Sequence, residues 1–380
     1  MPSVRRPATP KHLRVAELLD RDIRQLAPGT PIMPVTELME RFQVSQGTVV
    51  HALRTLRTRG LITRPAGKKR LVTSSRVRSR DAVLNVLVLC PNWSSPDYNT
   101  TNQALLDEAR RQRCALESVH YGSEWGKEWG VHWREILTRA VQAHDGVVVL
   151  PSSIQSGLEE ILHETGKPSV MLWEPELAAG MMCVADDDRA AGWMATRHLQ
   201  SLGHARIAAF LSEPQLQGMK NRLDGWEQAM REAGETNPGR LVIDGSVQPG
   251  SDSIVGSYEK FRRWLFQNNN QFDATAVFCL HWTGALAVLR ALEEVGIEVP
   301  GDVSVLAHAG QNRFTEFTKP ALTVVQGNVE QAARQALAML KAVCVGDKPA
   351  EKTVLIPQAI VERASTRRID ARTTRARHSS

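Results

Sequence analysis

Apolar residues in the first part of the chain recur at helical spacing, in short segments separated by breaks. Positions 15, 19, 23 and 26 are apolar and predict a helix over 11–26. The sequence APGTPIMP (27–34) ends this helix, because proline and glycine interrupt helical periodicity. A second short helix is expected over 35–42, and its inward residues would be Leu38, Met39 and Phe42.

A third helix follows, and its two faces differ in character. Ser45 is placed to cap its N-terminus, and Gly60 ends it. The predicted buried face consists of Val49, Ala52, Leu53 and Leu56, and the opposite face of Gly47, His51, Arg54 and Thr58. The segments LITR and RLVT are then expected to form two strands around the basic turn PAGKK. Three helices and a hairpin in this order predict a winged helix-turn-helix domain over residues 1–75.

From Val83 onward, short apolar runs alternate with helical stretches. The runs are VLNVLVLC, DGVVVLP, PSVMLW, RIAAFLS, LVIDG, ATAVFCL, VSVLAH, LTVV and KTVLIP. The helical stretches include 100–113, 130–142, 188–202, 220–233, 282–295 and 328–343. This alternation predicts an α/β fold of doubly wound parallel sheets, and its length favours two lobes. We expect a linker over 76–82, the two-lobed domain over 83–366 and a basic, disordered tail over 367–380.

Charge is distributed unevenly along the chain. Residues 1–80 carry 17 Lys and Arg against 5 Asp and Glu, whereas the remaining 300 residues carry 30 against 36. A small basic domain on a larger acidic body is typical of a protein whose basic part meets a polyanion such as DNA. A solvated basic tail is the alternative, and the core periodicity of the same segment argues against it. The third helix is narrow enough for the major groove of double-stranded DNA, and the basic turn could bind phosphates.

Amino-acid composition and motif spacing argue against export, membrane insertion, metal binding and catalysis. The five cysteines are scattered without metal-ligand or CxxC spacing, which favours a reduced, cytoplasmic protein. No apolar run is long enough to span a membrane, and the N-terminus lacks the apolar segment of an export signal. We expect no metal site at ADDD (185–188), because consecutive carboxylates rarely converge on one ion. We also expect no cofactor and no enzymatic activity, since no catalytic set has a supporting context. GSDSIVGS lacks phosphate-loop spacing and is interpreted as a loop.

The N-terminal part resembles the GntR family of bacterial regulators. The resemblance rests on APGTPI, TELMERFQVSQGTVVHALRTLRTRGLITR and AGKK, and covers residues 11–73. It departs from the family where arginine is usual, at Thr36, Gln46 and Val50, so the operator is expected to be unusual or affinity to depend more on the wing. Gln46 could pair with adenine, and His51 or Arg54 with guanine. The candidate DNA-binding residues are Ser45, Gln46, Thr48, His51, Arg54, Lys68, Lys69 and Arg70. A winged helix that serves protein contacts is the alternative.

The body resembles the effector domain of the LacI/GalR repressors, relatives of periplasmic sugar-binding proteins. The resemblance rests on DDDRAAGWMATRHLQSLGHARIAAF (186–210), NRLDGW (221–226) and ALAVLRALEEVGIEVPGDVSVLAH (285–308), followed by KPALTVV and VERAST. Together with a GntR-type head, the chain is similar to the arabinose-repressor architecture. The resemblance implies a type I periplasmic-binding-protein-like fold, with two lobes joined by three strand crossings and a ligand between them. Asp187 and Arg222 match positions that bind sugar in the family, although a helix-terminal acid and a surface ion pair are the alternatives.

Two family positions depart from the pattern. His281-Trp282 stands where Asn-Asp is usual, and Ala307-His308-Ala309-Gly310 replaces Gly-Tyr/Phe-Asp-Asp. The pocket is therefore expected to lose acceptors and to gain an aromatic side chain. Ring faces stack well on sugars, although Trp193 and Trp226 are expected in the core. The candidate effector-binding residues are Trp93, Tyr98, Trp173, Asp187, Arg222, His281 and Trp282.

These observations favour a ligand-responsive transcription regulator, most simply a repressor. We expect a homodimer on a pseudo-palindromic operator, with a sugar or sugar derivative controlling operator affinity through lobe closure. One alternative is a DNA-binding protein whose cleft has lost small-molecule sensing and is constitutive or controlled by a partner, which the changes at His281 and Ala309 motivate. Another is an enzyme fused to a DNA-binding head, and the absence of a cofactor-lysine context disfavours it.

Overall fold

A computed structural model of the protein describes residues 10–369 with internal gaps. The gaps are residues 24–25, 27–28, 59–60, 65–69, 74–82, 92–94, 122–131, 151–156, 176–179, 214–216, 249–250, 311–312 and 348. The expected linker at 76–82 lies outside the described residues, as does most of the expected tail. The packed chain continues to Ile369, which is 9% exposed and donates its backbone N–H to the carbonyl of Leu202.

The N-terminal domain contains three helices and a two-stranded hairpin, as the apolar pattern predicts. Its elements are α1 (Lys11–Ile23), α2 (Val35–Phe42), α3 (Gln46–Thr58), β1 (Ile62–Thr63) and β2 (Val72–Thr73). The strands pair antiparallel, with Ile62 opposite Thr73. All four residues expected on the buried face of α3 lie in the core of this domain, together with Leu38 of α2. The prediction for Leu26 is wrong: α1 already ends at Ile23, so Leu26 lies beyond the helical stripe and is 42% exposed.

The first lobe is built on a six-stranded sheet in the order β13-β7-β6-β5-β3-β4, in which every neighbouring pair is parallel. Its strands are β3 (Leu84–Pro91), β4 (Cys114–Tyr121), β5 (Gly146–Val149), β6 (Ser169–Leu172), β7 (Met182–Asp186) and β13 (Thr353–Ile356). On one face pack α4 (Pro96–Gln112) and α12 (Val329–Cys344). On the other pack α6 (His132–Ala143) and α7 (Leu158–Thr165). Helices on both faces explain why these strands are continuous apolar runs.

The second lobe repeats this plan with the order β14-β12-β11-β10-β8-β9, in which only the β12–β14 pair is antiparallel. Its strands are β8 (Ile207–Leu211), β9 (Val242–Asp244), β10 (Ala276–Cys279), β11 (Ser304–Ala309), β12 (Thr323–Gln326) and β14 (Ala359–Val361). One face is covered by α8 (Asp188–Ser201) and α9 (Gln217–Glu232), and the other by α10 (Ser253–Gln267) and α11 (Trp282–Glu294). Two short 3-10 helices complete the lobe, η2 (Pro238–Leu241) and η3 (Phe314–Glu316).

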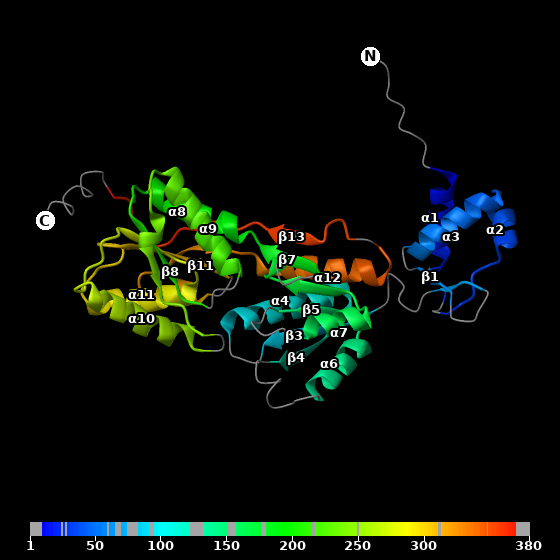
Figure 1. Cartoon of the computed structure of the whole chain (residues 1–380), viewed down its shortest axis with the longest axis horizontal. Helices are drawn as coiled ribbons and strands as arrows, with labels where there is room; N and C mark the ends of the chain where they lie inside the picture. Colours follow the sequence, from blue (N-terminus) through cyan, green and yellow to red (C-terminus); the bar gives the residue numbers. More distant parts are fainter. Residues whose placement is uncertain are drawn as a thin grey trace, which may run out of the picture.

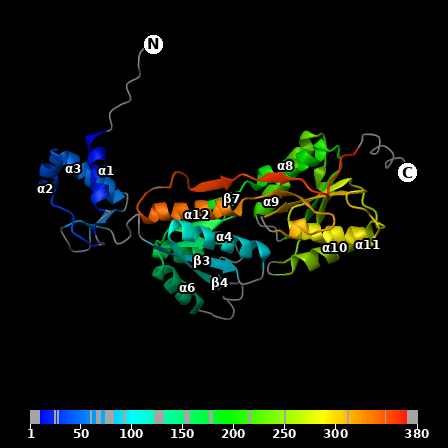
Figure 2. The same ribbon diagram turned by 180° about the vertical axis from the view of Figure 1, so that it is seen from behind.

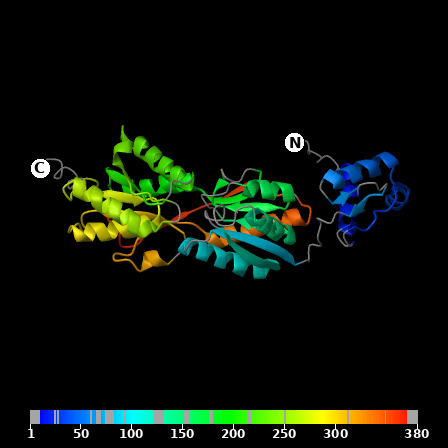
Figure 3. The same cartoon turned by 60° about the horizontal axis from the view of Figure 1, so that its bottom comes forward.

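The chain passes between the two sheets three times within the described residues, which confirms the expected number of crossings. The crossings run from β7 to α8, from β12 to α12 and from β13 to β14. The first lobe lies between the N-terminal domain and the second lobe (Figures 1 and 2). Seen from below, the two lobes lie side by side along the long axis, joined by the red and orange C-terminal segments (Figure 3). Every crossing leaves a carboxyl-terminal strand end, so the crossings and the strand ends share one region.

Several elements of the body were not predicted, and two of them, α10 and β4, have a local reason. The segment GSDSIVGS, interpreted as a loop, contains the start of α10: Asp252 caps the helix by accepting from the backbone N–H groups of Ile254 and Val255 at 2.9 and 3.0 Å. The edge strand β4 mixes polar and apolar residues, because it pairs on one side only. The elements β7, β14 and α7 are short.

Candidate nucleic-acid interface and interlobe cleft

Helix α3 presents a polar and basic face to solvent. Its cap is formed by Ser45, whose Oγ accepts from the backbone N–H of Thr48 at 3.4 Å and lies 3.0 Å from the Thr48 hydroxyl. The side chains of Gln46, His51 and Arg54 are exposed along the outer face. His51 also contacts the ring of His12 at a centroid distance of 5.7 Å. An exposed helix face of this width and charge has the shape needed to enter a major groove.

The predicted wing is only partly described. Arg70 is exposed beside β2, and Lys68 and Lys69 lie outside the described residues. The hairpin is anchored to the rest of the domain by Ile32, which donates its backbone N–H to the Leu71 carbonyl at 2.9 Å. Thr30 extends this anchor through a hydrogen bond from its N–H to the Thr73 hydroxyl at 2.9 Å. The base of the wing is therefore fixed relative to α3.

In the body, polar side chains gather where the carboxyl ends of the two parallel sheets face each other. Open α/β sheets bind ligands at this edge. The first lobe contributes Asp97 at the start of α4, Glu174 after β6 and Asp186 at the end of β7. The second lobe contributes Asp188, Glu213, Arg222, His281 and His308. We call this set the interlobe cluster.

Direct contacts between the two lobes occur at the start of α11. The indole Nε1 of Trp282 donates to Asp97 Oδ2 at 2.9 Å, and His281 Nε2 lies 3.2 Å from the same oxygen. On its other side, His281 Nδ1 lies 3.2 Å from Glu213 Oε1. The hydroxyl of Thr283 donates to Glu213 at 2.7 Å and lies 2.8 Å from His281 Nδ1. These residues form an interlobe bridge, in which one imidazole joins a carboxylate of each lobe.

The electrostatics of the bridge favour a charged imidazole. Burial by itself lowers the pKa of His281, but Glu213 and Asp97 more than compensate and raise it to about 9. Burial likewise acts to raise the pKa of Glu213, and His281 lowers it below its ordinary value. At neutral pH the bridge therefore consists of an imidazolium between two carboxylates. Trp282 also stacks on Phe314, with ring centroids 5.6 Å apart, which covers the bridge with apolar surface.

A second group of polar residues lies next to the strand crossings. The guanidinium of Arg222 donates through Nε to Asp188 Oδ1 at 2.6 Å and through its NH1 nitrogen to the Leu280 carbonyl at 2.9 Å. Burial raises the pKa of Asp186 to about 7, and the neighbouring Asp188 carboxylate adds to this effect, whereas Arg222 opposes it. His308, behind Asp188, is held neutral: burial, and then Arg222 and His281, lower its pKa well below the ordinary value.

Helices α8 and α9 place Asp188 and Arg222 through a very close approach at two glycines. A Cβ at Gly192 would lie 1.9 Å from the Arg222 carbonyl oxygen, and one at Gly225 would lie 2.0 Å from the Arg189 carbonyl oxygen. Real Cβ atoms do not come this close, so glycine is required at both positions. The segment NRLDGW thus has a packing role in addition to supplying Arg222, because Gly225 lets α9 lie directly against α8.

The remaining candidate residues have varied surroundings. Asp187 caps α8 by accepting from the Ala190 N–H at 3.1 Å, so its carboxylate serves the helix N-terminus. Tyr98 and Trp173 pack against the core of the first lobe and remain partly exposed. Trp173 has a φ of 73°, a conformation that costs energy for a bulky residue and is enriched at functional sites. Trp93 lies outside the described residues.

Sequence reasoning missed most of the interlobe cluster. The expectation that the pocket loses acceptors considered Ala309, which is fully buried in the core. It did not consider Asp97, Glu174 and Glu213, each of which follows a buried parallel strand. For Glu174 and Glu213, the available signal was their position two residues after such a strand. Trp226 is in the core as expected, whereas Trp193 is 39% exposed and donates to Glu232.

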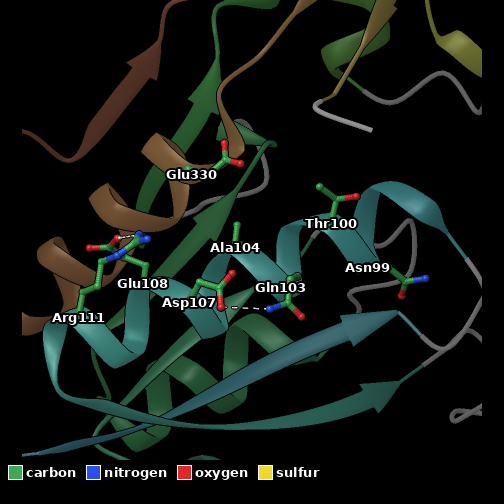
Figure 4. A pocket seen from close by; sticks show the side chains of 8 residues that line it. All are labelled: Asn99, Thr100, Gln103, Ala104, Asp107, Glu108, Arg111 and Glu330. Atoms are coloured by element: carbon green, nitrogen blue, oxygen red, sulfur yellow. Dashed lines mark hydrogen bonds and ion pairs between the residues drawn. The ribbon is translucent and has the colours of Figure 1, made fainter. Parts of the chain in front are cut away.

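A hollow on the surface of the first lobe lies between α4 and α12, outside the interlobe cluster. Figure 4 shows its lining residues, Asn99, Thr100, Gln103, Ala104, Asp107, Glu108, Arg111 and Glu330. Within this lining, Gln103 donates to Asp107 at 3.1 Å, and Arg111 forms an ion pair with Glu108 at 3.1 Å. Part of the polar lining of the hollow is therefore already engaged within the protein.

The described part of the chain shows neither a metal-binding cluster nor a membrane-spanning helix. It holds no group of three or more His, Cys, Asp or Glu side chains that could bind a metal ion. No helix in it is both long enough and apolar enough to cross a bilayer.

Comparison with known proteins assigns the two parts separately. The family of bacterial regulatory proteins described as gntR matches residues 11–72, and the periplasmic binding protein-like domain matches residues 196–366. The HTH-type transcriptional repressor PurR of Vibrio vulnificus is 27% identical over 198 residues, which are 52% of this chain and 56% of that protein. The HTH-type transcriptional regulator DegA of Bacillus subtilis is 29% identical over 231 residues, 61% of this chain and 63% of that protein.

The matched region is thus less than two thirds of the length of either relative. Among solved structures, a LacI family transcriptional regulator from Enterococcus faecium with bound ribose has a TM-score of 0.63 at 24% identity, over 75% of this chain and all of that one. At this identity the likeness establishes the fold of the body. The chain therefore joins a helix-turn-helix domain of the GntR type to a two-lobed domain of the periplasmic-binding-protein-like fold.

Proposed function

We propose that this protein is a ligand-responsive bacterial transcription regulator that acts as a repressor. The observation that carries the proposal is the combination of an exposed, basic helix α3 in a GntR-type domain with a polar cluster between two lobes of a binding-protein fold. The similar PurR proteins are named as transcriptional repressors, and the similar regulator from Enterococcus faecium holds ribose. A small, polar effector in the cleft between the lobes fits this set of observations.

On the DNA side, α3 enters the major groove, and Gln46, His51 and Arg54 reach base edges. Ser45 and Thr48 lie at the helix N-terminus, where backbone N–H groups attract phosphate. Arg70, Lys68 and Lys69 of the wing add phosphate contacts. Two such domains in a homodimer read the two halves of a pseudo-palindromic operator in the cytoplasm.

On the effector side, the interlobe bridge provides a mechanism. The bridge joins Asp97 of the first lobe to His281 and Trp282 of the second. An effector that binds among these residues changes the relative placement of the lobes, and so the relative placement of the two DNA-binding domains. A hundredfold change in operator affinity requires a coupling free energy of about 2.7 kcal/mol, which is within the usual allosteric range.

A gel-shift titration tests the DNA-binding half of this proposal. The probe is a duplex containing the promoter region upstream of the protein's own gene, and a scrambled duplex of equal length is the control. We expect retardation at moderate salt with the promoter probe at concentrations at least tenfold lower than with the control. Equal retardation of both probes would mean that the protein does not recognise an operator there.

A second candidate function follows from the interlobe bridge itself. Since His281 and Trp282 occupy positions where the family pattern has Asn-Asp, the bridge could hold the lobes together permanently, as in a constitutive or partner-controlled repressor. Thermal-shift screening against a carbohydrate library separates the two, because an effector raises the melting temperature by mass action. Stabilisation by any member that also alters operator affinity favours the sensing protein.

A further inference from the structure

The acidic side of the interlobe cluster holds more negative charge than its own cations neutralise. Among the described residues of the cluster, five carboxylates face Arg222 and a protonated His281. His281 is engaged with Asp97 and Glu213, and Arg222 with Asp188 and a backbone carbonyl. Asp186, between these groups, forms no ion pair within the described residues.

The inner part of the cluster also contains buried polar atoms that lack a partner. Oδ1 of Asp186 and both ring nitrogens of His308 are buried and form no hydrogen bond within the described residues. The amide of Gln358 is close enough to shift the pKa of both side chains, yet it forms no well-aligned hydrogen bond with either. His308 is 3% exposed, and its Nε2 lies 3.8 Å from Asp188 Oδ1, so the ring faces the carboxylates. Leaving buried polar atoms unpaired costs free energy, and a ligand that supplies hydrogen bonds would recover it.

Distances to two glycines show that these groups converge. A Cβ at Gly218 would lie 2.7 Å from Asp188 Oδ2 and 3.7 Å from Glu174 Oε1, so both carboxylates border the same point. A Cβ at Gly327, on the crossing that leads into α12, would lie 3.0 Å from Asp186 Oδ2. Asp186 and Asp188 are near enough that each carboxylate disfavours the charge of the other. Asp188 and Glu174 thus border one point, and Asp186, two residues from Asp188 in sequence, lies at the adjoining strand crossing.

We propose that the effector carries a protonated nitrogen, such as a primary amine, which binds among Asp186, Asp188 and Glu174. This inference rests on the proposed sensing function and specifies the chemical class of its ligand. An ammonium group has three donors and no acceptor, which matches a site of carboxylate oxygens. Its charge relieves the repulsion between Asp186 and Asp188, and charge-assisted hydrogen bonds are stronger than those of a neutral hydroxyl. A neutral sugar would satisfy the same oxygens without relieving that repulsion.

Matched pairs of small molecules test the inference on the full-length protein. Each pair replaces one hydroxyl by an amine: glucosamine with glucose, galactosamine with galactose, and putrescine with 1,4-butanediol. We expect at least one amine to raise the melting temperature saturably, and to bind at least tenfold more tightly than its hydroxyl counterpart by titration calorimetry. Equal binding of both members, or binding of no amine, overturns the inference.

Variants locate the binding site. Glu174→Gln and Asp186→Asn each remove one charge with little change in shape, and each is expected to weaken amine binding tenfold or more. Glu159→Gln, on the exposed face of α7, is the matched control and should bind as the wild type does. Unchanged amine affinity in both cleft variants places the amine elsewhere and contradicts the inference. The matched-pair comparison needs only the wild-type protein, so it stands even if a variant folds poorly.

Operator binding by the same preparation separates failure of this inference from failure of the proposed function. If the operator is bound and a neutral sugar weakens or strengthens that binding, the protein is a sensor and the amine inference is wrong. If the protein binds the operator but neither the amines nor the neutral compounds, the amine inference is again wrong, and the constitutive repressor is favoured. If no operator is bound, the proposed function itself fails, whatever the amines do.

Discussion

Replacing His281 by asparagine, the residue usual at this position in the LacI/GalR pattern, removes the cation from the interlobe bridge. Asp97 and Glu213 would then face each other from two lobes without a positive charge between them. The neutral groups of the bridge, Thr283 and the Trp282 indole, remain in place in this variant. Its stability relative to the wild type therefore reports mainly on the charge of the imidazole.

The size and sign of the effect follow from the pKa of His281. Because Glu213 and Asp97 raise it from its ordinary value of 6.5 to about 9, protonation stabilises the folded state. That stabilisation is fully present below the ordinary pKa and is lost as pH rises through about 9. Linkage gives a loss of about 2 kcal/mol between pH 7 and pH 9, and about 3 kcal/mol in all. Neutral His308, from β11, also faces the imidazole, and its low pKa keeps it from titrating in this range.

Urea denaturation followed by tryptophan fluorescence measures this difference at a series of pH values. We expect His281→Asn to unfold with about 2 kcal/mol less free energy than the wild type at pH 7, and the two proteins to approach each other by pH 10. Subtracting the two curves cancels Asp186 and the other groups that titrate in both proteins. The control is His163→Asn, at an exposed position on α7, which also removes an imidazole but leaves the bridge unchanged. A His281→Asn difference that stays constant from pH 7 to pH 10 would refute the charged bridge.

Three further experiments test other parts of the structure. Gly225→Ala should destabilise the body by about 2 kcal/mol or more in thermal denaturation, because the added Cβ would meet a backbone carbonyl of α8. Gly47→Ala is the matched control: its Cβ would meet nothing within 4 Å, so it should stabilise α3 by up to about 1 kcal/mol. Equal effects of the two would disprove the close helix contact. Leu56→Ala should lower the free energy of unfolding of the N-terminal domain by about 3 kcal/mol, since the Leu56 side chain is fully buried. An unchanged free energy of unfolding in urea denaturation would argue against that core. Arg54→Ala should weaken operator binding about tenfold in gel shifts and Arg110→Ala, on α4, should not; equal losses would point to a general charge effect.

Local patterns predicted much of the fold because the relevant forces act over a few residues. Helical periodicity at Val49, Ala52, Leu53 and Leu56 identified the buried face of α3, and the structure places all four in one core. Apolar runs identified nine of the body strands, because strands buried on both faces must be apolar throughout. The same rule missed β4, an edge strand whose polar residues reach solvent. It also gave no information on α10, where a single capping aspartate begins a helix in a Gly/Ser-rich segment.

The amino-acid sequence was enough to predict the two-part organisation, the charge of the N-terminal domain and most of the secondary structure, since each depends on composition or short-range periodicity. It did not determine which polar residues meet. Asp97 and His281 are 3.2 Å apart, although nearly half of the chain separates them in sequence. They meet because parallel strands bring all their carboxyl ends to one edge and three crossings bring the two edges together. Only this tertiary arrangement decided that the acids between the lobes form one site, and that Asp187 caps a helix while its neighbours face the cleft.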